Sequence, residues 1–156
     1  MNRTHLHVKR NRASIEVVSG VILLLSGCVI YILFRSKSLN IYQWCCALGL
    51  TGLIDNYRGV VHDWNVSDVV KYSLPDGIYC AAYILIVDAI WHREYGIQKY
   101  IVISLVPIVA IGCEVLQGLN LIRGSFDVLD LVCYALPPLV YVCIIKYKNN
   151  NKKQQV

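Results

Sequence analysis

Four long apolar runs, each 18 to 20 residues in length, constrain this chain more than any other feature. They cover residues 17–34, 74–91, 100–119 and 126–145, and the first of them carries no charged residue. A helix of about 20 mostly apolar residues is what crosses the hydrocarbon core of a bilayer. The whole chain is 56% hydrophobic and only 16% charged, whereas a soluble domain has roughly 25% charged residues. We therefore expect an all-α, polytopic membrane helix bundle in a single domain over residues 1–145.

A fifth apolar segment, residues 39–54, has only 16 residues and includes Asn40, Gln43, Gly49 and Gly52. Its length slightly favours a re-entrant or interfacial helix over a span, so four spans are expected and five are the alternative. Residues 58–72 are expected to be a loop or an interfacial helix. The polar tail at residues 146–156 is predicted to be disordered.

The fifteen Lys and Arg residues help to decide between these topologies. Cytoplasmic segments are enriched in basic residues, and both tails of this chain are basic. Four spans with both tails inside place ten basic residues inside and five outside, whereas five spans place seven inside and eight outside. We expect four spans in a bacterial cytoplasmic (inner) membrane, with both termini in the cytoplasm.

One alternative concerns the first run. A basic start, an apolar stretch and then Leu25, Ser26, Gly27 and Cys28 are similar to a bacterial lipoprotein signal in which Cys28 carries the lipid. The residues after Cys28 stay strongly apolar, and the uninterrupted run is long enough to span. A spanning helix is therefore the preferred interpretation.

Ionisable residues inside spans are costly, at about 2.5–3.5 kcal/mol each at the helix centre, so they indicate where function resides. Several occur near the expected outer ends of three spans. The candidate ligand-binding residues are Asp76, Glu114, Gln117, Arg123, Asp127 and Asp130. The third and fourth spans are joined by a short connection, so Glu114, Gln117, Arg123 and Asp130 are expected to converge. Asp127 has a simpler explanation in the first turn of a helix capped by Ser125, and Asp88 is expected to pair with His92 or Arg93.

The cluster resembles the VanZ-like family of membrane proteins. The residues that carry the resemblance are Glu114-Val115-Leu116-Gln117, then Arg123, then Asp130, together with Leu74-Pro75-Asp76 at the start of the second span. The likeness covers roughly residues 74–140, and the chain departs from it at Tyr134, where the family usually has Asn. The resemblance implies a bacterial cell-envelope role and does not supply a reaction.

Three classes of function follow from these residues. The first is an envelope protein that binds a polar envelope lipid or a peptidoglycan-related ligand at an acidic/Arg pocket. The second is a membrane-embedded enzyme that uses paired carboxylates on a lipid-linked or cell-wall substrate. The third is a structural or partner subunit, or a small channel-like effector. The spacing of the seven cysteines and four histidines fits no metal site, and neither a cofactor nor nucleic acid is expected.

Overall fold

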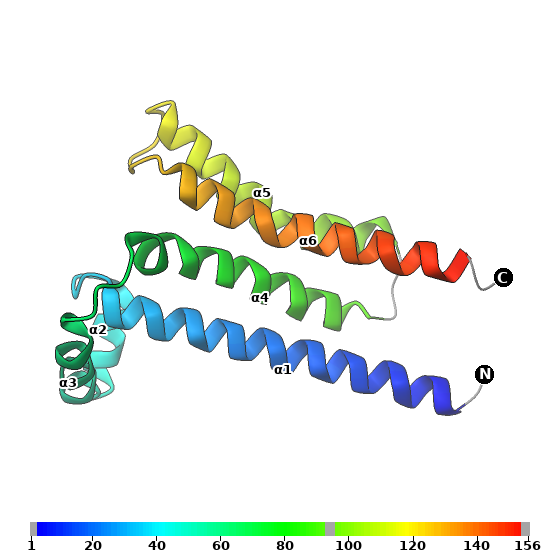
Figure 1. Ribbon diagram of the computed structural model, residues 1–156, viewed down its shortest axis with the longest axis horizontal. Helices are drawn as coiled ribbons and strands as arrows, with labels where there is room; N and C mark the ends of the chain where they lie inside the picture. Colours follow the sequence, from blue (N-terminus) through cyan, green and yellow to red (C-terminus); the bar gives the residue numbers. More distant parts are fainter. Residues whose placement is uncertain (1–2, 93–95, 154–156) are drawn as a thin grey trace.

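Four long helices form the body of the protein (Figure 1). The computed structural model describes residues 3–92 and 96–153, with side chains over 13–92, 96–148 and 150–151. The long helices are α1 (Arg3–Phe34), α4 (Leu74–Ile90), α5 (Ile97–Gly118) and α6 (Val128–Lys153). The segments long and apolar enough to cross a membrane are Ala13–Phe34, Val69–Ile90, Ile97–Gly118 and Val128–Lys148. The prediction of an all-α, four-span membrane protein is confirmed.

Both termini lie at the same end of the bundle (Figure 1). We name this the proximal end, formed by the termini and the connection between α4 and α5. The distal end is formed by the C-terminal end of α1, residues 35–73, and the connection between α5 and α6 at residues 119–127.

The segment predicted to be ambiguous, residues 39–54, divides into two short helices at the distal end. These are α2 (Asn40–Ala47) and α3 (Thr51–His62), separated by a turn in which Gly49 has a φ of 73°. Eight and twelve residues rise only about 12 and 18 Å, well short of the roughly 30 Å hydrocarbon core. The segment therefore adds no fifth span.

The central helix is α4, which packs against α1 on one side and against α5 and α6 on the other. Cys80, Ile84 and Val87 are buried at a spacing that places them on one face of α4, and Ile103 of α5 meets them. On the opposite side, Gly20 and Gly27 of α1 lie one heptad apart, and their missing side chains leave room for Ile86 and Tyr79. Small residues at such crossings allow helices to approach closely without a polar contact.

Two helix limits differ from the sequence-based expectation, and a third segment contains more than one kind of structure. The second span begins five residues early, because a π-helical turn (Val69–Ser73) precedes α4. The last helix, α6, begins at Val128 and continues to Lys153, so the disordered tail predicted from residue 146 is not seen over residues 146–153. Residues 58–72, expected to be a loop or an interfacial helix, contain the end of α3, a short loop and most of the π-helical turn.

Candidate functional site

The distal start of α4 is shaped by Pro75. Proline has no N–H and its ring would collide with the carbonyl four residues earlier, so a regular α-helix cannot run through this point undisturbed. The chain widens into the π-helical turn at Val69–Ser73, where the N–H of Leu74 bonds to the carbonyl of Val69. One carbonyl of this turn, that of Tyr72, accepts a hydrogen bond from Arg35 Nη2 at 3.0 Å. Such turns occur often at functional sites.

Arg35 follows α1 directly and reaches across to α4. Its Nη2 lies 3.9 Å from Asp76 Oδ2, with the two side chains 29% and 20% exposed. The guanidinium is held between the rings of Tyr31 and Tyr72, at 5.1 Å from each ring centre. A cation beside aromatic rings and a carboxylate is attracted to both. Arg35 thus attaches the end of α1 to the start of α4.

The first turns of α6 bring further acidic and hydroxyl groups to Asp76. Asp130 and Tyr134 lie four residues apart on one face of α6, and both are electrostatic neighbours of Asp76. The helices approach closely here because Gly77 of α4 faces Cys133 of α6, where an added Cβ would lie 3.0 Å from the Cys133 carbonyl oxygen. The Oδ1 atom of Asp130 is shielded from solvent and has no hydrogen-bond donor among the residues that the structure describes.

Glu114 links the end of α5 to the start of α6. Its side chain is buried, and its Oε1 accepts the backbone N–H of Asp127 at 2.6 Å. Asp127 in turn accepts the N–H of Leu129 at 2.8 Å, so Asp127 is the cap of α6. The cap predicted at Ser125 is therefore wrong by two residues. Glu114 is also an electrostatic neighbour of Asp76, which places it at the edge of the same group.

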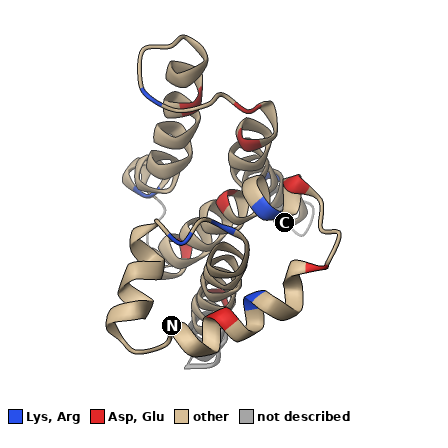
Figure 2. Ribbon diagram, turned by 90° about the vertical axis from the view of Figure 1, so that its left-hand side faces the viewer, with Lys and Arg blue, Asp and Glu red and all other residues tan. Residues whose placement is uncertain are grey.

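We call Arg35, Asp76, Glu114, Asp130 and Tyr134 the distal cluster. It joins α1, α4, α5 and α6, and Figure 2 looks onto this end of the bundle, where acidic segments lie on several helices. Three carboxylates stand against one guanidinium, which already contacts both Asp76 and the Tyr72 carbonyl. Two polar atoms of the cluster, Asp130 Oδ1 and Arg35 Nε, are shielded from solvent and have no hydrogen-bond partner among the described residues.

Gln117 and Arg123 lie outside the distal cluster. The Gln117 side chain packs against Gly124, where an added Cβ would overlap Gln117 Cδ. Arg123 is exposed in the connection between α5 and α6, and it makes no hydrogen bond or ion pair with the side chains that the structure describes, those of residues 13–92, 96–148 and 150–151. Of the four residues expected to converge, Glu114 and Asp130 lie in the distal cluster with Asp76, whereas the arginine of the cluster is Arg35. Sequence reasoning missed Arg35, although it directly follows the charge-free span.

A second polar group lies at the proximal end. Asp88 of α4 forms an ion pair with Lys99 of α5 at 2.5 Å and accepts a hydrogen bond from the Tyr141 hydroxyl of α6 at 2.6 Å. Lys99 is only 7% exposed. The predicted partner Arg93 lies outside the described residues, and the His92 ring lies 3.0 Å from the Ala89 carbonyl. This triad ties three helices together near the termini.

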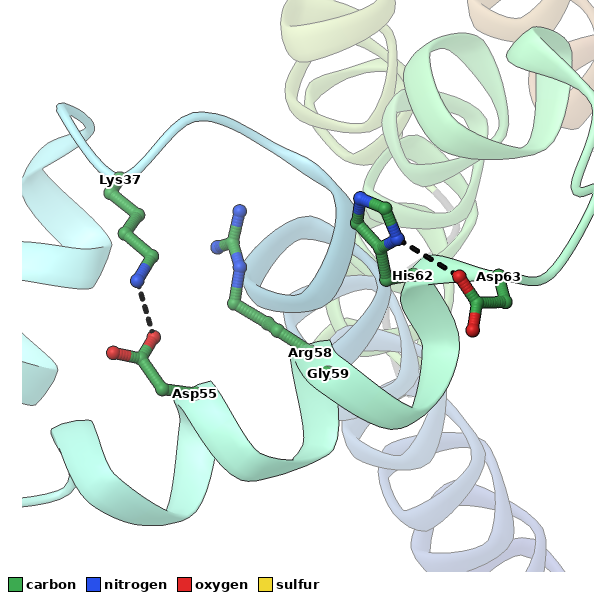
Figure 3. A pocket seen from close by; sticks show the side chains of 6 residues that line it. All are labelled: Lys37, Asp55, Arg58, Gly59, His62 and Asp63. Carbon is green, nitrogen blue, oxygen red and sulfur yellow. Dashed lines mark hydrogen bonds and ion pairs between the residues drawn. The ribbon is translucent and has the colours of Figure 1, made fainter.

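An open hollow of about 600 Å³ lies beside α3 (Figure 3). Its lining residues are Lys37, Asp55, Arg58, Gly59, His62 and Asp63. The Asp55 carboxylate forms an ion pair with Lys37 Nζ at 2.7 Å and accepts a hydrogen bond from the Tyr42 hydroxyl at 2.9 Å. Nearby, His62 Nδ1 lies 3.1 Å from Asp63 Oδ1. The pKa of Asp55 is lowered, first by its bond to Lys37 and then by that to Tyr42. No three His, Cys, Asp or Glu residues in the described part of the chain are grouped so as to hold a metal ion.

No protein-family model, no curated protein and no solved structure matches the chain. The assignment of function therefore depends on the geometry of the distal cluster.

Proposed function

We propose that the protein is an envelope protein of the bacterial cytoplasmic membrane, and that its distal cluster binds the amine-bearing group of a polar envelope ligand. We propose further that it is a divergent member of the VanZ-like group, on the residues Glu114, Gln117, Arg123 and Asp130. The observation that carries the binding proposal is the solvent-shielded Oδ1 of Asp130, which no donor within the described residues satisfies.

A buried carboxylate oxygen without a donor is costly, and the cost grows near a membrane. Asp130 stands beside a second carboxylate, Asp76, and their repulsion adds to that cost. The neighbouring guanidinium of Arg35 contacts the Tyr72 carbonyl as well as Asp76. An ammonium group would supply several donors and a positive charge, and charge-assisted hydrogen bonds of this kind are the stronger ones. The Tyr134 hydroxyl is already engaged with Asp76, so it helps to hold the carboxylate that would face the ammonium group.

The proposed orientation places the distal cluster on the outer side of the membrane. Four spans put the basic tails on one side together with Lys99, and the distal end carries fewer basic residues. This distribution favours a cytoplasmic proximal end. A cluster at the outer headgroup level is accessible both to lipid headgroups and to cell-wall precursors.

The test is a thermal unfolding series on the purified full chain in mild detergent. Three probes are added separately: phosphatidylethanolamine, phosphatidylglycerol, and a soluble peptidoglycan fragment with a free amine. We expect one of the two amine-bearing probes to raise the unfolding temperature of the wild type, and the identity of that probe separates a lipid from a cell-wall source. The Asp130→Asn variant should lose most of this shift.

The matched control is Asp68→Asn, since Asp68 is exposed at the same end and, among the described residues, its ion pair is with Lys71. This variant should respond to the probes as the wild type does. Equal responses to all three probes, or an undiminished response in Asp130→Asn, would remove the cluster from the proposal. Chemical conversion of any probe would instead assign the paired carboxylates to a membrane-embedded enzyme.

A further inference from the structure

One side of α3 is apolar and exposed. Leu53, Tyr57 and Val60 recur at intervals of four and three residues, which places them on one side of a helix that turns 100° per residue, and Trp64 follows two residues after the helix ends. Their side chains are 63%, 62%, 61% and 59% exposed, although all four are large hydrophobic or aromatic groups. We call these four residues the α3 stripe.

The rest of α3 is already occupied. Arg58 donates to the carbonyls of Ile32 and Arg35 at 2.7 and 2.6 Å, which satisfies the free carbonyls at the end of α1. Val61 is buried beside this contact. Asp55, Gly59 and His62 lie on the side of the helix opposite the α3 stripe, and they line the polar hollow of Figure 3. The helix therefore has a docked side, a polar side and an unpartnered apolar side.

The position of α3 fits a location at the membrane surface. It lies across the distal end, away from the α5–α6 connection, rather than parallel to the spans (Figures 1 and 2). The apolar surface of the distal half of α1, including Leu25 and Val29, is exposed as well, so apolar surface occurs on both elements that Arg58 joins. Trp44 of α2 and Leu48, which directly follows α2, are 68% and 74% exposed, and they add to the apolar surface at this end.

We infer that α2 and α3 form a membrane-surface anchor, whose α3 stripe inserts at the boundary between lipid headgroups and acyl chains beside the distal end of the spans. Amphipathic helices with an apolar side and an opposite polar side bind in this way. Tyr and Trp, which make up half of the α3 stripe, favour this zone because they have an apolar ring and a polar edge. The anchor also holds Arg35, because Arg58 binds the Arg35 backbone while the Arg35 side chain contacts Asp76.

Depth-dependent fluorescence quenching tests the anchor. A full-length chain with Trp44→Phe and Trp91→Phe keeps Trp64 as its only tryptophan. It is placed in vesicles of phosphatidylcholine brominated near the glycerol end or near the methyl end of the acyl chain. We expect strong quenching by the shallow bromines, weaker quenching by the deep ones, and little quenching by aqueous iodide.

Two neighbouring substitutions serve as the matched pair. Val60→Asp places a charge in the α3 stripe and should reduce quenching of Trp64 by the shallow bromines. Gly59→Asp places the same charge on the polar side, where an added Cβ meets nothing within 4 Å, and should leave quenching unchanged. Quenching by iodide alone would mean that the stripe faces water. Protection from both iodide and bromine would mean that protein, such as a second copy of this chain, covers it. Either result would overturn the inference.

Discussion

The carboxylate of Glu114 accepts the backbone N–H of Asp127 across the connection between α5 and α6, at 2.6 Å. This bond joins the last turns of one span to the cap of the next, and it does so from a buried side chain. Glu114→Ala is expected to cost about 1.5–3 kcal/mol in the free energy of unfolding, the usual contribution of a hydrogen bond to a charged group. Glu114→Gln should cost less, because an amide oxygen can still accept. Unfolding in mild detergent measures both, and equal stability of Glu114→Ala and wild type would contradict this role.

The close approach of α4 and α6 at Gly77 gives a second prediction. In Gly77→Ala the new methyl would lie 3.0 Å from the Cys133 carbonyl oxygen, and the α6 backbone could move away only at the cost of its own packing. We expect a loss of about 1–3 kcal/mol in stability, typical of overpacking. Gly52→Ala is the control, because its Cβ meets nothing within 4 Å and alanine favours a helix. If both variants unfold alike, the close crossing is not as described.

The proximal triad should behave as a buried ion pair. Lys99→Met removes the cation that pairs with Asp88 at 2.5 Å, and breaking a buried ion pair by removing one partner costs about 3–5 kcal/mol. Replacing all three groups, with Asp88→Leu, Lys99→Met and Tyr141→Phe together, should recover most of that loss, since no buried charge remains unpaired. The comparison uses the same unfolding assay, and a triple variant no more stable than Lys99→Met would refute the argument.

Asp55 provides a prediction of pH dependence at the attachment of α3. Its pKa lies below the ordinary value of 3.8 because Lys37 and Tyr42 bond to its charged form. A lowered folded pKa adds stability that is present above pH 3.8 and is lost as the pH falls through the folded pKa. The Lys37 pKa is raised by the same bond, so its contribution is present below pH 10.5 and is lost as the pH rises through the raised value. Carbon-13 NMR titration of Asp55 should return a pKa under 3.8 in the wild type and a higher one in Lys37→Met.

The topology can be checked with cysteines placed in a cysteine-free chain. Ser38→Cys and Ser125→Cys lie at the distal end, whereas Asn150→Cys lies on α6 beyond the proximal end of its span. An impermeant thiol reagent should label the first two from one side of intact vesicles and the third from the other. Five spans would instead put residues 38 and 125 on opposite sides.

The spans could be predicted because they depend on local composition alone. Each observed span overlaps its predicted range, and the largest error is at Val69–Ser73, where Lys71 and Tyr72 conceal the start of the second span. The short length of the apolar segment at residues 39–54 also predicted correctly that it forms no fifth span. The helical continuation of α6 past residue 146 was missed because the polarity of Lys146–Lys153 indicates exposure to water and not the absence of a helix.

The distal cluster was only partly predictable. Glu114 and Asp130 are close in the sequence, and a short connection implies that their helices are neighbours. Arg35 and Asp76 are far apart in the sequence and meet only because α1 packs against α4, a contact that depends on Gly20 and Gly27. Arg123 lies nearer to Glu114 along the chain, yet it is exposed in the connection after α5, where the chain turns at Asn120 with a φ of 58°.

Asp130 decides the central claim, that the distal cluster binds an amine-bearing group. Native mass spectrometry of the protein released from detergent can count the phosphatidylethanolamine and phosphatidylglycerol molecules that stay bound, for wild type, Asp130→Asn and Asp68→Asn. Where the ligand is a lipid, the wild type and Asp68→Asn should retain phosphatidylethanolamine preferentially, and Asp130→Asn should lose that preference. Where it comes from the cell wall, the same loss should appear with the amine-bearing peptidoglycan fragment. Equal retention of every probe by wild type and Asp130→Asn would contradict the claim.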